Sequence, residues 1–364
     1  MPAYARLSRR SRRRGLAGLT NYQISFLAVY DMMDLFITLD YELFLGEKTG
    51  TPENCLIQPM NELCSIADRV GFKYIIFVDA AYLLRLFQLK GQCSQLSQDY
   101  ALISNHIKQL ANIGHDIQLH FHPQWLYSTY NNIKREWNLD YQHYKLSDME
   151  TGFAFEALSA SKRLLDDLVG YKTYTFRAGG YCLDSFAEFT RLFKENGIKI
   201  DSSVARNMHE NKYAHSFDYR RVPSPSIYRF SDNVTREFDT GDFVELSINS
   251  AKINIVEYLT VVRKLQKKYS PTLFYKDGES INNMEKDSLL KRVLSILKGK
   301  VYLASIDGVS STMLPLYINK SKENTCILIG HPKNATDASI YNFNTFLERN
   351  KNTFHIKTTK DLLK

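Results

Sequence analysis

Apolar and polar positions follow one repeated order along this chain. A segment with apolar residues at helical spacing ends at a glycine, and a short apolar run and a polar stretch come next. Residues 56–70 show the order first, because Gly71 follows a helical face made of Leu56, Met60, Leu63, Ala67 and Val70. The same order recurs over residues 100–113, 155–169 and 185–196, which precede Gly114, Gly170 and Gly197. Each of these glycines predicts the end of a helix.

The short apolar runs predict strands of a parallel sheet. Four of them follow the helices, at residues 74–78, at a run that ends at His122, and at residues 174–176 and 198–200. Further candidate strands lie at residues 35–39, 244–248, 301–306 and 326–329. Helices that alternate with such strands are typical of βαβ units. The number of repeats favours a distorted (β/α) barrel of about seven strands, in the α/β class, over a small open sheet.

Domain organisation follows from the absence of any Pro/Gly/Ser-rich linker, so residues 34–364 are predicted to form a single barrel domain. Residues 208–242 are polar and aromatic and contain Pro223 and Pro225. They predict a long loop over the active face. The lysine-rich stretch 263–300 predicts a helical, solvated insertion rather than a nucleic-acid patch.

Charge is concentrated at the start of the chain. The net charge is +8 over 364 residues, and six arginines lie within the first fourteen positions. Residues 1–33 are interpreted as a disordered basic leader, or as the product of a start codon placed too early, since Met32 and Met33 stand just before the first convincing strand. The alternative is an arm for nucleic acid or an anionic surface. The leader interpretation is preferred, and no nucleic-acid partner is expected.

Composition also bears on the compartment. Apolar residues make up 44% and charged residues 24% of the chain, as in ordinary globular proteins, and no apolar stretch is long enough to cross a bilayer. No stable membrane insertion is therefore expected. The polar residues 20–23 interrupt the apolar region that a secretory signal needs. Five scattered cysteines without C-x-x-C spacing argue against a disulfide framework, so a cytoplasmic location is expected.

Candidate chemistry gathers where the predicted strands end, because parallel α/β folds bring the carboxyl ends of their strands to one edge. Asp40 and Glu42 follow the strand 35–39, and residues two apart on a strand point to the same side. Two acids at the end of an apolar strand are costly to bury without a purpose. A solvated loop start or a helix cap is the alternative, with equal weight.

A pair of histidines ends the third predicted strand. His120 and His122 again lie two apart, and Pro123 follows them. Imidazole is the most common nitrogen ligand of divalent metals, so the pair favours a metal site over two structural histidines. His115 falls on the opposite side of an ideal strand and is expected to be a supporting or structural group.

Two later strand ends add an arginine and a histidine. Arg177 precedes the pair Gly179 and Gly180, which allow a tight turn or a close approach to a ligand. An arginine near carboxylates can keep one of them ionised and oriented, although a surface ion pair is the alternative. His331 ends the strand 326–329 and is a candidate general acid or third metal ligand, with a turn histidine as the alternative.

The order of these motifs resembles the polysaccharide deacetylase superfamily, which is carbohydrate esterase family 4 or the NodB-homology fold. The resemblance spans about residues 34–335 and places this chain as a divergent member. The residues that carry it are Thr38-Leu39-Asp40-Tyr41-Glu42, Gly114-His115-Asp116-Ile117 with His120-Phe121-His122-Pro123, Phe176-Arg177-Ala178-Gly179-Gly180-Tyr181, Gly197-Ile198-Lys199-Ile200-Asp201-Ser202-Ser203, and Leu328-Ile329-Gly330-His331.

The resemblance implies a metal-dependent hydrolase that removes an acetyl group from an N-acetylated amino sugar or glycan. It implies that Asp40 is the general base, that Arg177 orients it, and that His331 protonates the leaving amine. Glu42, His120 and His122 would hold a divalent metal, with zinc the expected ion. A backbone N–H between Gly179 and Tyr181 would stabilise the oxyanion. Gly180, Tyr181 and Trp125 are the expected substrate contacts, although aromatic residues such as Trp125 more often pack in the loop.

Two departures from the family pattern change what is expected of the site. Tyr41 stands where the family has its second aspartate, normally a metal ligand, so Glu42 takes that role. The metal histidines are two residues apart rather than four, which predicts an altered geometry and an untypical substrate. Without a signal sequence, a sugar precursor or lipid-linked glycan is a more suitable substrate than a secreted polymer.

Three other functions stay open. The amidohydrolase barrel also carries H-x-H, but on its first strand, whereas here the pair follows at least two strands and an acidic motif. A deformylase or another hydrolase of non-peptide C–N bonds is compatible with the same residues. A catalytically inactive carbohydrate-binding relic is favoured by Tyr41 and disfavoured by the retention of Asp40, Arg177 and His331.

Overall fold

A computed structural model describes residues 32–183, 186–212, 215–263, 277–280 and 299–363. The leader predicted for residues 1–33 lies outside the described residues up to position 31, and most of the lysine-rich stretch 263–300 does too. Strand β1 begins at Met33. Among the described residues, no helix is both long enough and apolar enough to span a membrane.

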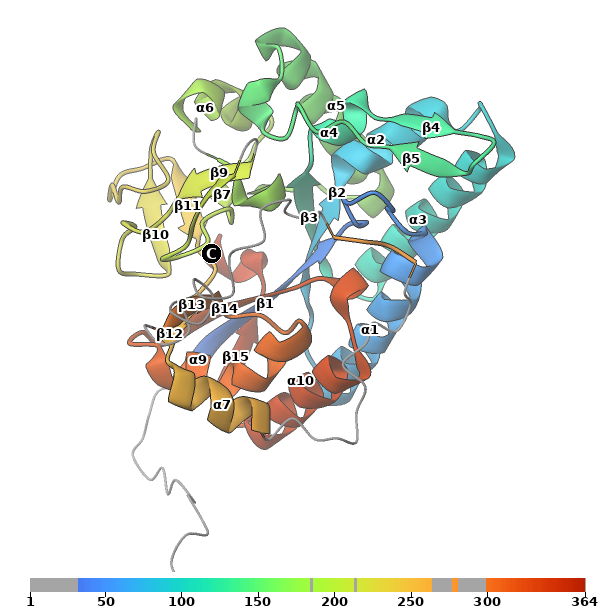
Figure 1. Ribbon diagram of the computed structural model, residues 1–364. Coiled ribbons are helices and arrows are strands. Elements are labelled where there is room, and N and C mark those ends of the chain that lie inside the picture. The colour runs from blue at the N-terminus through green and yellow to red at the C-terminus, as the bar shows by residue number, and fades with distance from the viewer. Residues whose placement is uncertain (1–31, 184–185, 213–214, 264–276, 281–298, 364) are drawn as a thin grey trace, which may run out of the picture. The chain divides into compact units, whose positions relative to one another are not determined.

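One curled sheet organises the chain from Met32 onward (Figure 1). Seven strands run parallel in the order β11-β7-β6-β3-β2-β1-β14. Strand β10 pairs with β11 in the antiparallel direction, and β15 pairs with the first half of β1. Their bounds are β1 (Met33–Tyr41), β2 (Ile75–Asp79), β3 (Asp116–Phe121), β6 (Thr175–Ala178), β7 (Ile200–Asp201), β10 (Ile227–Phe230), β11 (Phe243–Leu246), β14 (Thr325–Gly330) and β15 (Phe354–Lys357). The predicted α/β barrel of about seven strands is confirmed.

The two ends of the curled sheet meet through backbone hydrogen bonds. Asn249, just beyond β11, donates its N–H to the carbonyl of Ile327 in β14 at 3.2 Å. The segment after β13 also pairs with β14, because Ile306 donates to Ile329 at 2.9 Å. The sheet therefore curls far enough to enclose an interior, as a barrel does.

Helices cover the outer side of the sheet, and the predicted glycine stops are confirmed. Gly71 and Gly170 take left-handed φ angles of 85° and 79° after α1 and α5. The prediction missed α2, which is apolar on nearly every side. The bounds are α1 (Gln58–Val70), α2 (Ala80–Leu89), α3 (Ser94–Asn112), α4 (Gln124–Tyr127), α5 (Thr151–Val169), α6 (Phe186–Glu195), α7 (Ile255–Arg263), α9 (Leu314–Lys320) and α10 (Asp337–Arg349).

Three small antiparallel pairs complete the described structure. The segment 208–242 was predicted as one long loop, but it contains two hairpin strands and the edge strand β10. Short strands with few apolar residues, such as β8 (His209–Lys212), lack the apolar run that predicts a strand from the sequence. The pairs are β4 (Thr129–Asn131) with β5 (Glu136–Asn138), β8 (His209–Lys212) with β9 (His215–Asp218), and β12 (Ser250–Ile253) with β13 (Lys300–Leu303).

Candidate active site

Polar side chains fill the carboxyl-terminal end of the barrel interior. Parallel register places Asp40 beside Phe77, Asp79 beside His120, and His120 beside Arg177, so these side chains all point to one side of the sheet. All four polar groups are at most 3% exposed. Buried charges are tolerated only when they are paired or bind a metal, so this cluster needs a physical explanation.

Glu42, His120 and His122 form a compact set of three ligand atoms. Oε2 of Glu42 lies 2.6 Å from Nε2 of His122 and 3.2 Å from Nε2 of His120. Within the described part of the chain, this is the set whose donor atoms all lie within 4.8 Å of one another. Two imidazoles and one carboxylate that leave a position open are the ligand set of many catalytic zinc sites.

The hydrogen bonds of His120 fit a metal ligand. Its Nδ1 lies 2.9 Å from the carbonyl oxygen of Arg177, which can only accept, so Nδ1 carries a proton and Nε2 faces Glu42. Metal-binding histidines usually fix their second nitrogen in this way. Burial opposes protonation of His120, but Asp40 and Glu42 outweigh it and raise its pKa to about 9. A bound divalent cation would take the place of the Nε2 proton.

On its Nδ1 side, His122 is held by packing rather than by a hydrogen bond. Its buried Nδ1 has no hydrogen-bond partner. The backbone of Gly179 covers the ring so closely that a Cβ there would lie 2.5 Å from Nδ1. The ring of Tyr144 meets it edge-on, with 6.1 Å between the centroids. The absence of a side chain at Gly179 therefore leaves room for the ring of His122.

Arg177 connects Asp40 to the sheet. Its Nη1 lies 2.5 Å from Oδ1 of Asp40, while Nη2 donates to Thr38 at 3.0 Å and to the hydroxyl of Ser202 at 2.8 Å. Nε donates to the carbonyl of Ser202 at 2.9 Å, and the guanidinium lies 4.0 Å above the ring of Phe77. The second carboxylate oxygen of Asp40 remains directed toward the histidines. Arg177 thus has the orienting position that its motif predicted.

A second buried acid pair supports Arg177 from behind. Glu245 of β11 lies in register with Asp201 of β7, so the two buried carboxyl groups lie on neighbouring strands. Burial, followed by the charge of Asp201, raises the pKa of Glu245 well above its usual value, so Glu245 is the protonated partner. Asp201 then accepts hydrogen bonds from the N–H and the hydroxyl of Ser203 at 2.9 and 2.8 Å. This fixes the turn that presents Ser202 to Arg177.

His331 faces Asp40 across the site. Its Nε2 lies 3.6 Å from Oδ2 of Asp40 and 3.8 Å from Oε1 of Glu42. Its Nδ1 lies 2.6 Å from Oδ2 of Asp307, and Oδ1 of Asp307 accepts the backbone N–H of His331 at 2.9 Å. Burial opposes protonation, but Asp307 and then Asp40 outweigh it and raise the pKa of His331. A histidine oriented by a carboxylate in this way is suited to donate a proton.

Two functional neighbours were missed by the sequence reasoning. Asp307 follows the predicted strand 301–306, so the same argument from strand ends would have found it. Lys333 lies two residues after His331 and reaches Glu42, with 2.8 Å between Nζ and Oε1. No pattern in the sequence marks this lysine, because the 3-10 turn Pro332–Asn334 alone brings it inward.

The turn Gly179–Tyr181 lies over the ligand set. Gly180 and Tyr181 have positive φ angles of 59° and 66°, and a Cβ at Gly180 would lie 2.5 Å from the hydroxyl of Tyr144. Burial, followed by the charge of Asp40, raises the pKa of the Tyr181 phenol. A positive φ is unusual for tyrosine and often marks functional turns.

Three sequence-predicted residues lie away from the cluster. Tyr41 points outward and bonds Nδ1 of His106 at 2.8 Å, so Glu42 is the carboxylate that reaches the histidines. His115 accepts the N–H of Tyr74 at 3.1 Å and is structural. Trp125 corrects an expectation, because it is fully buried against Tyr82 and Trp137 and has no face for a sugar ring. Apolar packing outweighs surface recognition at this position.

Asp79 is a further buried acid beside the set. Oδ1 accepts the N–H of Tyr82 at 3.4 Å and that of His122 at 3.3 Å, while Oδ2 has no hydrogen-bond partner. Burial raises the pKa of Asp79, and the two site histidines oppose this rise. Its carboxylate caps α2 and fixes the backbone of His122.

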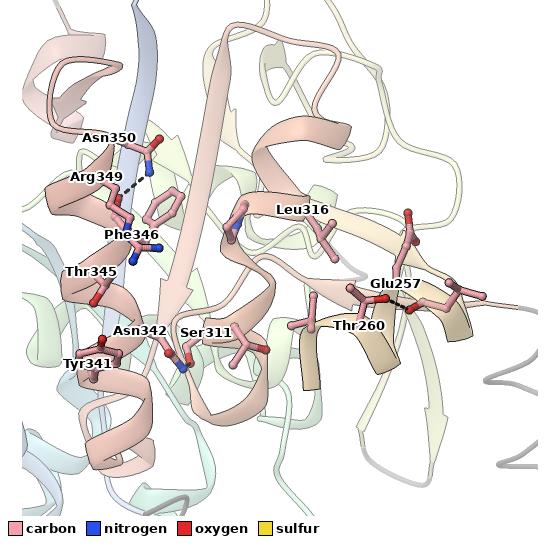
Figure 2. Close-up of a pocket in the computed structure, with 14 residues that line it drawn as sticks. Glu257, Thr260, Ser311, Leu316, Tyr341, Asn342, Thr345, Phe346, Arg349 and Asn350 are labelled. Atoms are coloured by element: carbon pink, nitrogen blue, oxygen red, sulfur yellow. Dashed lines mark hydrogen bonds between the residues drawn. The ribbon is translucent and has the colours of Figure 1, made fainter. Parts of the chain in front are cut away.

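A separate cavity of about 590 Å³ lies between α7, α9 and α10 (Figure 2). Its lining includes Thr260, Ser311, Asn342 and Phe346, and none of the residues in the polar cluster lines it. Figure 2 shows that two of its dashed bonds are internal to helices, from Asn350 to Phe346 and from Thr260 to Val256. The polar cluster of the barrel interior therefore lies apart from this cavity.

No family model matches the chain, and no curated protein does. Among solved structures, it is similar to a protein of Mycobacterium smegmatis assigned to the polysaccharide deacetylases, with 11% identity, a TM-score of 0.47, and coverage of 92% of this chain and 91% of that one. It is also similar to an allantoinase named PuuE (12%, TM-score 0.45, 90% and 88% covered). A family 4 carbohydrate esterase from Streptomyces lividans matches at 8%, a TM-score of 0.38, and 90% and 92% coverage.

These neighbours include carbohydrate esterases of family 4 and polysaccharide deacetylases, which is the family that the sequence motifs resemble. The match extends over at least 90% of this chain in each case. At such identities and TM-scores no argument about activity rests on them.

Proposed function

We propose that the chain is a metal-dependent hydrolase that removes an acetyl group from an N-acetylated amino sugar or glycan. One observation carries the proposal: Oδ2 of Asp40 lies between His331, at 3.6 Å, and His120, at 4.0 Å, while Arg177 holds Oδ1. A base, its orienting group, an acid and a three-ligand set thus converge in one buried place. Metal-assisted amide hydrolysis uses all four functions, and carbohydrate binding alone needs none of the proton-transfer groups.

The three-ligand set fits a divalent metal. The Nε2 atoms of His120 and His122 both face Oε2 of Glu42, and the Nδ1–H of His120 is already engaged by a carbonyl. Imidazole nitrogen with carboxylate oxygen suits zinc, which is the ion we propose. When bound there, such an ion supplies Lewis acidity and lowers the pKa of water toward about 7.

Asp40 and His331 divide the proton transfers. Arg177 neutralises and fixes Oδ1 of Asp40, so Oδ2 is the oxygen that takes the proton from the attacking water. His331, with Nδ1 engaged by Asp307, carries a proton on Nε2 and gives it to the leaving amine. Acid–base catalysis of this kind contributes about 10²–10⁴-fold. A backbone N–H of the turn Gly179–Tyr181 is the proposed oxyanion donor, and Gly180 and Tyr181 are the proposed substrate contacts.

The substrate and the compartment remain parts of the proposal. An acetylated amino sugar precursor or a lipid-linked glycan is the substrate class that we favour, in the cytoplasm. The five cysteines, which all belong to the described residues, form no disulfide, which is compatible with that compartment. The expected absence of nucleic-acid partners stays a prediction.

The test is acetate release from a panel of N-acetylated amino sugars, short chito-oligomers and lipid-linked glycans, with zinc supplied. The native chain should release acetate from at least one of them, and Asp40→Ala should lose the activity by about 10²–10⁴-fold. N-formylated versions of the same sugars test for a deformylase. If the chain binds metal but hydrolyses no acylated amine, the carbohydrate-binding relic replaces the proposal.

A further inference from the structure

Lys333 is a buried cation in direct contact with the proposed metal ligand Glu42. Its Nζ lies 2.8 Å from Oε1 of Glu42 and 2.8 Å from the backbone carbonyl oxygen of Leu43. Its side chain is 9% exposed, and Nζ lies 5.3 Å from the ring centroid of Phe44. Both contacts thus lie on the chain segment that directly follows β1.

The two oxygens of Glu42 have separate partners. Oε1 faces Lys333, while Oε2 faces the Nε2 atoms of both histidines, at 2.6 and 3.2 Å. The structure shows no hydrogen bond from Lys333 to either imidazole among the described residues. The ammonium group therefore lies behind the carboxylate and outside the set of donor atoms.

We propose that Lys333 is a positioning residue that fixes Glu42 as a one-oxygen metal ligand with Oε2 directed at His120 and His122. The inference rests on the proposed metal site and adds to it a residue outside every motif of the sequence. A glutamate has one more rotatable bond than an aspartate, so holding it still costs more side-chain entropy. A bond to Oε1 and a second bond to the backbone of Leu43 remove that freedom.

The same short turn carries the acid and the anchor. His331 and Lys333 flank Pro332 at the start of the 3-10 turn Pro332–Asn334, and both reach Glu42. A shift of this turn would therefore move the proton donor and the metal-ligand carboxylate together. Lys333 also offsets one of the two negative charges that Asp40 and Glu42 bring into the interior, while Arg177 offsets the other.

The alternative role of Lys333, as a substitute for the metal, predicts the opposite change in metal affinity. If the ammonium group acted as a substitute for the metal, it would compete with the ion, and removing it would tighten metal binding. Repulsion between Lys333 and a divalent ion acts in that same direction. The sign of the change in affinity therefore decides between positioning and competition.

The experiment measures zinc affinity by chelator competition in the full chain, and records the visible absorption of its cobalt form. Lys333→Met should weaken zinc binding about 10–100-fold and change the cobalt spectrum, as the loss of an outer partner of a ligand does. Lys333→Arg should restore much of the affinity because it keeps the charge and the donors. The matched control is Lys320→Met, which breaks a 2.8 Å ion pair with Glu257 outside the site and should change neither readout.

Each remaining outcome counts against the inference. Unchanged or tighter zinc binding in a folded Lys333→Met variant overturns it and leaves the proposed function standing. If Lys333→Met does not fold, Lys333→Arg and Lys333→Gln carry the comparison, and equal affinities in these two variants overturn the inference. A native chain that binds no zinc or cobalt overturns the metal site itself, which separates the two failures.

Discussion

Nη1 of Arg177 lies 2.5 Å from Oδ1 of Asp40, and both side chains are almost completely buried. A buried ion pair of this kind serves geometry more than stability, because desolvation of the two charges offsets much of their attraction. Here it leaves Oδ2 of Asp40 as the free oxygen that faces His331 and His120. The relationship makes Asp40 a base with a fixed direction and accounts for the burial of an arginine in the barrel.

Arg177→Met should destabilise the fold by about 3–5 kcal/mol, since it leaves the charge of Asp40 buried without a partner. Urea denaturation measures the loss. Asp40→Asn in the same background should recover part of it, because the unpaired charge is then gone. Equal stabilities of Arg177→Met and the native chain would show that the pair is not formed in solution.

Asp307→Asn should move the alkaline limb of the kcat/KM profile to lower pH. The carboxylate of Asp307 is the largest of the influences that raise the pKa of His331, and Asn keeps its size without its charge. A raised pKa keeps His331 protonated above pH 6.5, so a lower pKa removes the acid form at a lower pH. An unshifted limb in an otherwise active variant would exclude His331 as the acid.

Gly179→Ala should weaken metal binding, because its Cβ would lie 2.5 Å from Nδ1 of His122 and push the ring from its place. Gly91→Ala is the matched control, as no atom lies within 4 Å of a Cβ there. Zinc affinity measured for both variants gives the comparison. Equal affinities would mean that His122 is not held by the glycine turn.

Glu245→Gln should flatten the dependence of stability on pH. The folded-state pKa of Glu245 is raised well above its unfolded value near 4.5, so folding takes up a proton. Its contribution is complete below the unfolded pKa and is lost as pH rises toward the folded pKa, at up to about 1.4 kcal/mol per pH unit. Glutamine cannot titrate and should remove this slope in denaturation curves between pH 5 and 8. A slope equal to that of the native chain would contradict the protonated pair.

The sequence predicts the sheet well because apolar runs and glycine stops are local signals. Gly71 and Gly170 end their helices with the left-handed φ that the pattern requires. The pattern did not predict α2, because this mostly apolar helix follows β2 directly, with no polar stretch between the strand and the helix.

At the candidate site too, some residues follow from local sequence patterns and others do not. The structure brings together five residues that the sequence places at strand ends, because parallel strands end at one edge of the sheet; they are Asp40, Glu42, His120, Arg177 and His331. Lys333 could not be found in this way, since its reach to Glu42 depends on the direction of a short turn. The prediction that Trp125 contacts the substrate was wrong for a related reason. A sequence does not show whether an aromatic ring faces a ligand or another ring.

The metal content of the purified chain tests the central claim most directly. After chelation and reloading with zinc, the native chain should hold close to one ion, and Glu42→Gln should hold far less, since it removes the oxygen that faces both histidines. Glu62→Gln, on the exposed side of α1, is the control and should bind as the native chain does. Equal zinc content in the native chain and in a folded Glu42→Gln variant would contradict a catalytic site built on Glu42, His120 and His122.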